Sequence, residues 1–141
     1  LSNAGVCEIS MKMLYYEKAE KWDEYANAAV AFLGTGKEQQ PELLDNIAWN
    51  FMQQVAQPEM LQKAQLWMQE AINQKPANFK YRETCAALLY KVGKPDKAMK
   101  ETEKAIEVAR QQGVDYSTTL KLQEFIRKSK PIPADFRESE D

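Results

Sequence analysis

The chain contains no histidine among its 141 residues. Histidine is the commonest general base near neutral pH and a frequent metal ligand, so its absence removes the usual routes to acid–base and metal-assisted catalysis. The sequence also lacks a glycine-rich phosphate-binding loop and a nucleophile motif. We therefore expect no catalytic residue, no metal and no cofactor, and we predict that the protein is not an enzyme.

The sequence has neither a strong charge excess nor a long apolar run. Its 19 Lys and Arg residues are interspersed with 21 Asp and Glu residues, for a formal net charge of −2. Nucleic-acid-binding domains usually carry a clear basic patch, and a helix that crosses a bilayer needs about 20 consecutive apolar residues. We therefore expect no nucleic-acid partner and no membrane insertion.

Cysteine is scarce. The two cysteines, Cys7 and Cys85, do not form a Cys-x-x-Cys pair. Cys85 stands among apolar residues on the expected inner face of a helix, where cysteine behaves as a small hydrophobic residue. We expect Cys85 to be buried and inert, while the role of Cys7 and the redox state of both thiols stay open.

Helix breakers divide the chain into seven segments whose apolar residues recur at spacings of three and four. These segments are rich in Ala, Glu, Lys, Gln, Met and Leu, which are favourable residues in helices. No strand alternation is present, so we predict an all-α fold. The expected helices cover about 6–18, 21–33, 41–55, 58–74, 79–92, 95–113 and 115–128.

A shift of 34 residues superimposes two of these segments. It places Ala64 on Ala98 and Ala71 on Ala105, since 98 − 64 = 34 and 105 − 71 = 34. A fixed period of this length indicates stacked units of two helices, and short connections make the two helices antiparallel. We therefore expect these alanines at close helix–helix contacts.

This pattern resembles the tetratricopeptide repeat (TPR). The third repeat carries Ala86 at the small position of its first helix and Gly93 before its turn, and Pro76 closes the second repeat. Two positions depart from the family pattern: Tyr25 stands where alanine is expected, and Met52 takes the small position in the second repeat. The resemblance implies a right-handed α–α superhelix of about three TPR-like hairpins plus a C-terminal capping helix. Its boundaries are a single domain over 6–130, repeats over about 6–36, 45–78 and 79–112, and a cap over 115–128.

The two ends are set apart from this domain. Ser2-Asn3-Ala4 is typical of the remnant of a cleaved tag, so residues 1–5 are excluded from the expected fold. Residues 131–141 form a short acidic tail. A narrower resemblance links the helices to a module that follows thioredoxin-like thiol–disulfide domains in some bacteria. That resemblance implies an extracytoplasmic, periplasmic location and a thioredoxin-like domain as a partner.

In TPR proteins the first helix of each repeat lines a concave groove that binds peptides. Such an amide-rich surface with aromatic residues can bond a peptide backbone and stack on a side chain. An alternative for Trp49 is packing against the helix over 6–18 or against a neighbouring domain. The groove positions implied by the resemblance are Asn46, Trp49, Asn50, Gln53, Lys80, Glu83, Thr84, Ala87 and Tyr90.

Some TPR proteins bind a C-terminal carboxylate with a five-residue clamp. Of the matching positions here, only Asn50 and Lys80 agree with that clamp, and the others are Ser10, Leu14 and Thr84. We therefore do not expect this chain to bind a terminal carboxylate.

The sequence thus predicts a protein–protein interaction module that binds a peptide or a partner domain in a groove. Two alternatives stay open. The chain could be a structural spacer or docking domain for an adjacent thioredoxin-like catalytic domain, or a self-association module that forms a homo-oligomer.

Overall fold

The computed structural model describes residues 3–137, apart from the side chains of residues 3, 4, 6 and 7. Within that range every regular element is an α-helix, which confirms the all-α prediction. The seven helices are α1 (Asn3–Lys18), α2 (Trp22–Leu33), α3 (Pro41–Gln54), α4 (Pro58–Gln74), α5 (Phe79–Lys91), α6 (Pro95–Gln112) and α7 (Ser117–Arg127).

The helix boundaries follow from local chemistry. Three helices begin with proline, whose missing N–H would be unpaired in a first turn anyway: α3, α4 and α6. Gly113 ends α6 in the left-handed conformation, with φ at 68°. Helix α1 begins at Asn3, inside the segment that the sequence sets apart as a tag remnant, and continues through Gly5.

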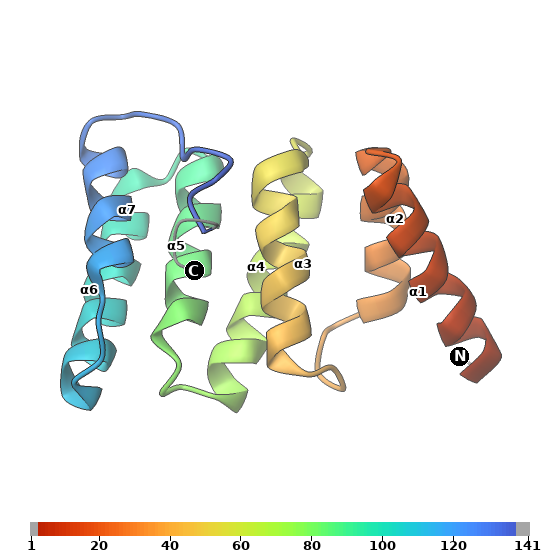
Figure 1. The fold of residues 1–141 in the computed structure, drawn as a ribbon, viewed down its shortest axis with the longest axis horizontal. Coiled ribbons are helices and arrows are strands. Elements are labelled where there is room, and N and C mark those ends of the chain that lie inside the picture. Colours follow the sequence, from red (N-terminus) through yellow and green to blue (C-terminus); the bar gives the residue numbers. More distant parts are fainter. Residues whose placement is uncertain (1–2, 138–141) are drawn as a thin grey trace.

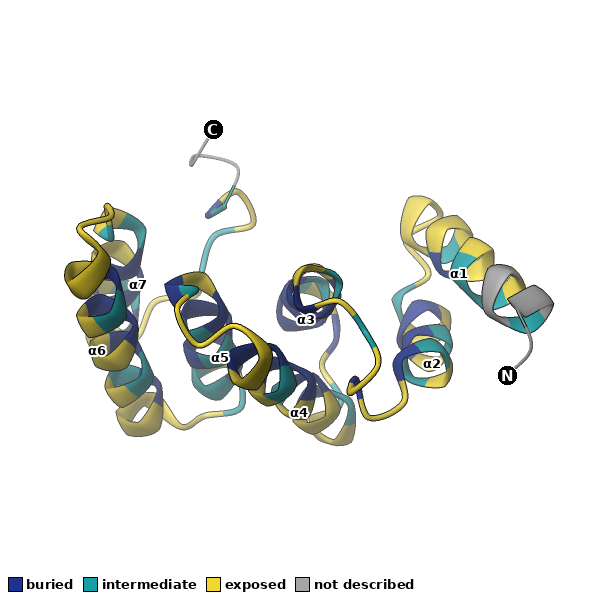
Figure 2. Cartoon of the chain, turned by 90° about the horizontal axis from the view of Figure 1, so that it is seen from below, coloured by how far each residue is buried: buried dark blue, intermediate teal, exposed yellow. Residues whose placement is uncertain are grey.

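The helices pack as consecutive pairs, α1 with α2, α3 with α4 and α5 with α6, and α7 packs on α6 and α5. Figure 1 shows the pairs side by side in a row. Figure 2 shows α1 and α3 on one side of this row and α2 and α4 on the other, while α6 lies beside α5 at the end of the row, with buried residues facing inward between the helices. Over the first two pairs, one side of the molecule is therefore built from the first helix of each pair.

The repeated alanines have the expected environment. Ala64, Ala71, Ala98 and Ala105 are all 0% exposed. A side chain of one methyl group lets two helix backbones approach closely, whereas a larger one would hold them apart. The alanine pattern therefore sets the faces that α4 and α6 turn inward.

The first helices follow a different spacing. Helix α3 begins at Pro41 and α5 at Phe79, so their starts differ by 38 residues (79 − 41 = 38). Ala48 and Ala86 each stand seven residues after the start of their helix, and both are fully buried. The small position of α3 is therefore occupied by Ala48, and our assignment of Met52 to that position is wrong.

The difference between the two spacings lies mostly at the start of α4. Pro58 precedes Ala64 by six residues (64 − 58 = 6), whereas Pro95 precedes Ala98 by only three (98 − 95 = 3). Since an α-helix has 3.6 residues per turn, α4 begins with almost one additional turn. The 34-residue spacing thus holds for the second helices and not for the first.

A tryptophan fixes the loop between α2 and α3. The Trp67 indole N–H donates a hydrogen bond to the Gly34 carbonyl at 3.0 Å. Gly36 has a φ of 84°, and a Cβ there would lie 3.1 Å from Trp67 Cδ1 and 3.2 Å from Leu44 Cδ2. Glycine is therefore required at position 36 by both conformation and space.

Candidate functional site

The chain beyond α7 folds back over the helices. Ser129 adopts a left-handed conformation with φ at 54°, and the Lys130 N–H donates to the Phe125 carbonyl at 2.9 Å. These features reverse the chain direction after the helix, as in other helix C-caps. Residues 131–137, which we call the docked segment, then lie against α5 and α3 on the side that Figure 2 shows away from α4 and α6.

Two side chains from the helices hold this part of the backbone. The Gln53 amide nitrogen donates to the Ala134 carbonyl at 2.8 Å. The Tyr90 hydroxyl donates to the Lys130 carbonyl at 2.6 Å, one residue before the docked segment. Both side chains were predicted to line a peptide groove, and both contact backbone atoms, which every peptide offers.

Phe136 occupies an aromatic site. Its ring centroid lies 5.9 Å from that of Trp49 at an interplanar angle of 29°, and 6.2 Å from that of Phe125 at 72°. Offset stacking and edge-to-face contact are the favoured geometries for aromatic pairs. Trp49 is buried beneath this ring and so packs against the chain's own C-terminal segment.

Arg137 is held from several directions. Its guanidinium carbon lies 4.0 Å from the centroid of the Trp49 ring. Nη1 donates to Asp45 Oδ2 at 3.0 Å, and Nη2 donates to Thr84 Oγ1 at 2.5 Å and to the Lys80 carbonyl at 3.3 Å. The planar, forked shape of the guanidinium satisfies all of these contacts at once.

The groups around Arg137 are polar and buried. Asp45 is 7% exposed, and Glu83 and Thr84 are 0% exposed. The Glu83 carboxylate accepts hydrogen bonds from Thr118 at 3.1 Å and Thr119 at 2.7 Å, and its other oxygen lies 4.0 Å from Arg137 Nη2. Two carboxylates removed from water thus face one guanidinium, an arrangement in which the cation offsets the cost of burying the anions.

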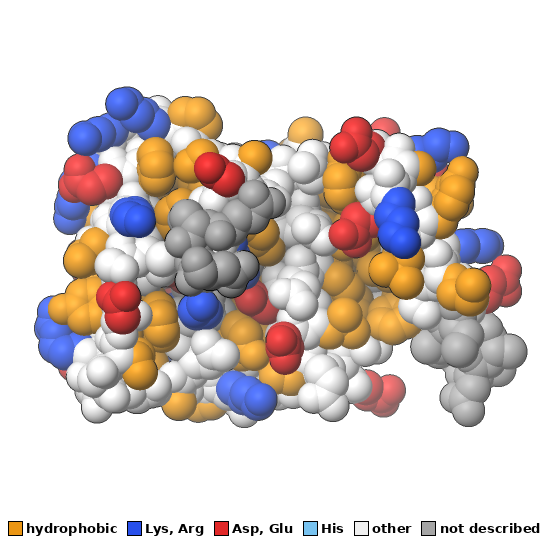
Figure 3. Space-filling view, in the orientation of Figure 1, with side chains coloured by type: hydrophobic (Ala, Val, Ile, Leu, Met, Phe, Trp, Pro, Cys, Tyr) orange, Lys and Arg blue, Asp and Glu red, His pale blue; other side chains and the backbone are white. Residues whose placement is uncertain are grey.

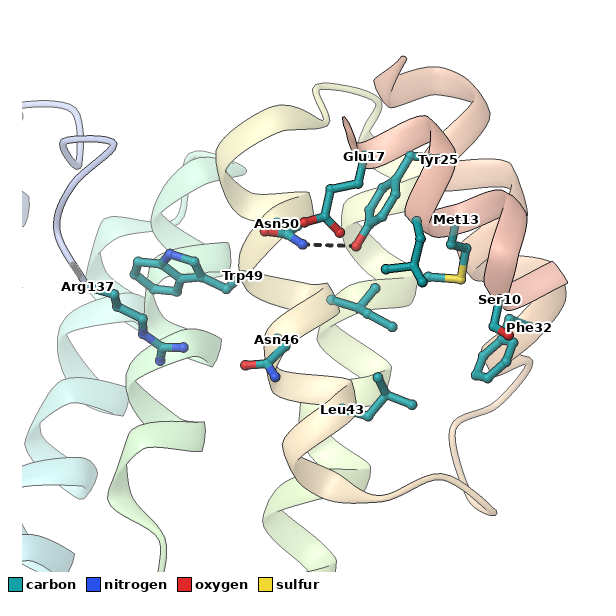
Figure 4. A pocket seen from close by; sticks show the side chains of 12 residues that line it. Ser10, Met13, Glu17, Tyr25, Phe32, Leu43, Asn46, Trp49, Asn50 and Arg137 are labelled. Carbon is teal, nitrogen blue, oxygen red and sulfur yellow. Dashed lines mark hydrogen bonds between the residues drawn. The ribbon is translucent and has the colours of Figure 1, made fainter. Parts of the chain in front are cut away.

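Beyond Arg137 the same side of the molecule stays open. A pocket of about 570 Å³ lies between α1, α2 and α3, with Trp49 and Arg137 at one end. Figure 4 shows Met13 and Ser10 on the opposite wall. Within the pocket the Asn50 amide donates to the Tyr25 hydroxyl at 3.0 Å, and burial raises the pKa of Tyr25 to about 12.

The nine predicted groove residues fall into three groups. Six contact the docked segment or the residue just before it, and two line the open pocket. The remaining one, Ala87, has no exposed surface and belongs to the hydrophobic core, so it does not line the surface as expected. The first six are Trp49, Gln53, Lys80, Glu83, Thr84 and Tyr90, and the two in the pocket are Asn46 and Asn50.

Sequence reasoning missed four residues of this site: Asp45, Phe125, Phe136 and Arg137. A 38-residue shift anchored on the buried alanines of α3 and α5 would have placed Asp45 on Glu83 (45 + 38 = 83). The docked segment was treated as a tail, and its adjacent aromatic and basic residues were the only signal of its role.

Cys85 is partly rather than fully buried. Burial, followed by the nearby Glu101 carboxylate, raises the pKa of its thiol from 9.0 to about 12. Since the thiolate is the nucleophilic form, this thiol is poorly reactive at neutral pH. The side chain of Cys7 lies outside the described residues.

The face that carries the docked segment has no dominant charge. Figure 3 shows basic and acidic side chains scattered over it, with apolar side chains between them. Across residues 3–137, no helix has the length and apolar content required to span a bilayer. The described side chains also include no cluster of three or more His, Cys, Asp or Glu residues that could hold a metal ion.

Comparisons of the chain with protein-family profiles, with curated proteins and with solved structures find no match.

Proposed function

We propose that this chain is a protein-interaction module of the tetratricopeptide kind, which binds a peptide along the side formed by α1, α3 and α5. One observation carries the proposal: this side holds residues 131–137 of the same chain, which end in a turn closed by the Phe136 N–H and the Pro133 carbonyl, through side chains of α3 and α5. In this proposal the three helix pairs are TPR units of a right-handed superhelix, and α7 is its cap.

The contacts are of the kinds that peptide-binding proteins use. An amide from Gln53 and a hydroxyl from Tyr90 reach backbone carbonyls, while Trp49 and Asp45 reach side chains. Backbone contacts supply affinity that does not depend on the peptide's sequence, and side-chain pockets supply selectivity. The open pocket next to Trp49 offers further surface to a ligand longer than the docked segment.

A displayed library of random peptides, selected against the whole chain, tests the proposal. We expect selected peptides to lose binding when Gln53→Ala or Asn46→Ala is introduced on the α3 surface. Gln69→Ala, an exposed glutamine on α4, is the matched control and should leave binding unchanged. Peptides whose binding is insensitive to both α3 substitutions would contradict the proposed site.

A second candidate, self-association, is favoured by the outer surface of α1. Met11, Leu14 and Tyr15 are 70%, 59% and 58% exposed, although large apolar side chains are usually covered. A second copy of the chain would cover them, as would the thioredoxin-like domain that the narrower resemblance implies. Light scattering should then give the molar mass of a dimer for the wild type and of a monomer for Met11→Glu, whereas a monomeric wild type would rule this candidate out.

A further inference from the structure

We infer that the site between α3 and α5 selects an aromatic residue followed directly by arginine, and that the docked segment occupies this site in competition with a partner peptide carrying the same pair. This inference rests on the proposed function and specifies its ligand.

The arginine position discriminates by shape as well as charge. The guanidinium lies over Trp49 while one of its nitrogens bonds to Asp45 and the other to Thr84. A lysine ammonium is a compact charge without a planar face, so it cannot make the stacking contact and both hydrogen bonds together. The site is therefore specific for arginine and not for positive charge in general.

The negative charge around the arginine position disfavours a C-terminal carboxylate, which is the ligand of the five-residue clamp in some TPR proteins. The buried Asp45 and Glu83 carboxylates would repel a terminal carboxylate, and Lys80 contributes its backbone carbonyl to Arg137 rather than its ammonium group. Thr84 accepts a hydrogen bond from the guanidinium. A position equivalent to part of an anion clamp thus binds a cation here.

The position before arginine requires a ring. Phe136 is enclosed by Trp49 and Phe125, and these two aromatic residues come from different helices, α3 and α7. An aliphatic side chain would lose both ring–ring contacts. Upstream of this ring, Gln53 contacts the backbone of Ala134, and the partly buried Ile132 packs against the hydrophobic core.

The docked segment is suited to act as a competitor. It is attached to α7 by the reversed turn at Ser129, so its effective concentration at the site is high and no second molecule is needed. It contains Pro131 and Pro133, whose restricted backbone lowers the entropy lost on docking. A partner peptide must therefore outcompete an occupant that is already present.

The test uses the full chain and a synthetic peptide with the sequence Pro-Ile-Pro-Ala-Asp-Phe-Arg, acetylated and amidated at its ends. The recipient is the double variant Phe136→Ala/Arg137→Ala, which vacates the site. We expect this variant to bind the peptide at least about tenfold more tightly than the wild type, because the competing segment no longer fits. A peptide in which lysine replaces the arginine should bind at least about tenfold more weakly than the original.

Matched substitutions locate the binding site. Adding Asp45→Asn to the double variant should lower the affinity for the arginine peptide at least about tenfold, because it removes a charge-assisted hydrogen bond. Adding Asp96→Asn, the same change on an exposed residue of α6, should leave the affinity unchanged within about twofold. If the double variant does not melt cooperatively, Arg137→Gln, which keeps the Phe136 ring, replaces it as the recipient.

Several results would overturn the inference. Equal binding of the arginine and lysine peptides would show that the site recognises positive charge and not the guanidinium group. Equal affinity of the peptide for the wild type and for the vacated variant would show that the docked segment does not compete. If library selection yields groove-dependent peptides without an aromatic–arginine pair, the inference fails and the proposed function stands. If no peptide of any kind binds a cooperatively folded vacated variant, both fail. A wild type with the molar mass of a dimer that becomes monomeric in the double variant would instead assign the segment to a neighbouring copy.

Discussion

Replacing Phe136 with alanine should release the docked segment while the helices stay folded. Burial of the ring contributes about 1.5–3 kcal/mol, and each of its two ring contacts adds about 0.5–1.5 kcal/mol. The arginine contacts and the backbone hydrogen bonds bring the total gain on docking to about 10 kcal/mol. Ordering the segment costs about 8 kcal/mol in conformational entropy, since its two prolines are already restricted. Docking is therefore favourable by only about 2 kcal/mol.

This small margin limits the effect of the substitution. Once the segment undocks, no further stability can be lost, so Phe136→Ala should reduce the free energy of unfolding by about 2 kcal/mol. Phe51→Ala is the comparison, because Phe51 is fully buried between helices and contacts the rings of Tyr25 and Trp67. Removing a core phenylalanine typically costs about 3–5 kcal/mol. We expect a fall in melting temperature of about 8 °C for Phe136→Ala and of about 12–20 °C for Phe51→Ala.

Tryptophan fluorescence separates release from general destabilisation. Undocking exposes Trp49 to water, so Phe136→Ala should shift native-state emission to longer wavelength and increase quenching by acrylamide. Trp67 is fully buried and bonded to a loop carbonyl, so its emission should not change. In a Trp49→Phe background the same substitution should produce no shift. A loss of stability as large as that of Phe51→Ala, or an unchanged emission spectrum, would refute the reasoning.

Four further predictions concern the helices and the loop between α2 and α3. Ala105→Glu places a carboxylate at a fully buried contact and should cost several kcal/mol of stability or prevent folding. Lys104→Glu, at the neighbouring exposed position, should cost less than about 0.5 kcal/mol. Thermal melting measures both variants, and similar values for the two would contradict the helix register. Gly36→Ala should lower stability by about 1–3 kcal/mol in urea titration, because alanine is strained at a φ of 84° and its Cβ meets Trp67; an unchanged midpoint would mean that the loop adapts freely. The pKa of about 12 for the Cys85 thiol implies that, in a Cys7→Ser background at pH 8, alkylation is slower by about 100-fold or more in the native chain than in urea. Between pH 9 and 12 the Cys85 thiol ionises in the unfolded chain but stays protonated in the folded chain, so the free energy of unfolding should fall as pH rises through this range. Cys85→Ala should make this fall with pH less steep.

The helices could be predicted from the sequence because their signals are local. Proline at the first helical position and glycine after the last one act within a single turn, so α3, α4 and α6 begin where the sequence indicated. The burial of the alanines of α4 and α6 could be predicted because the 34-residue repeat that relates them is apparent in the sequence itself. The register of α3 could not be obtained from that repeat, because an added turn at the start of α4 changes the spacing without any local signal in α3.

The site was predicted in part. Side chains such as Trp49 and Gln53 were identified because the resemblance to the tetratricopeptide repeat assigns such positions of each first helix to a groove. Arg137 was missed because it lies 92 residues from Asp45, and no local pattern links residues that far apart. Asp45 itself was missed because a wrong offset paired it with an apolar position. A long-range contact made by an irregular segment depends on the whole path of the chain.

The docked segment also has a consequence for how the chain unfolds. In a row of helix pairs each pair normally touches only its neighbours, so an end pair can separate while the rest persists. Arg137 and Phe136 connect the end of the row to α3, two helix pairs earlier than α7. This link ties the loss of the last helices to the loss of the middle ones, so the intact chain should melt in fewer, sharper steps than a chain whose segment has been released.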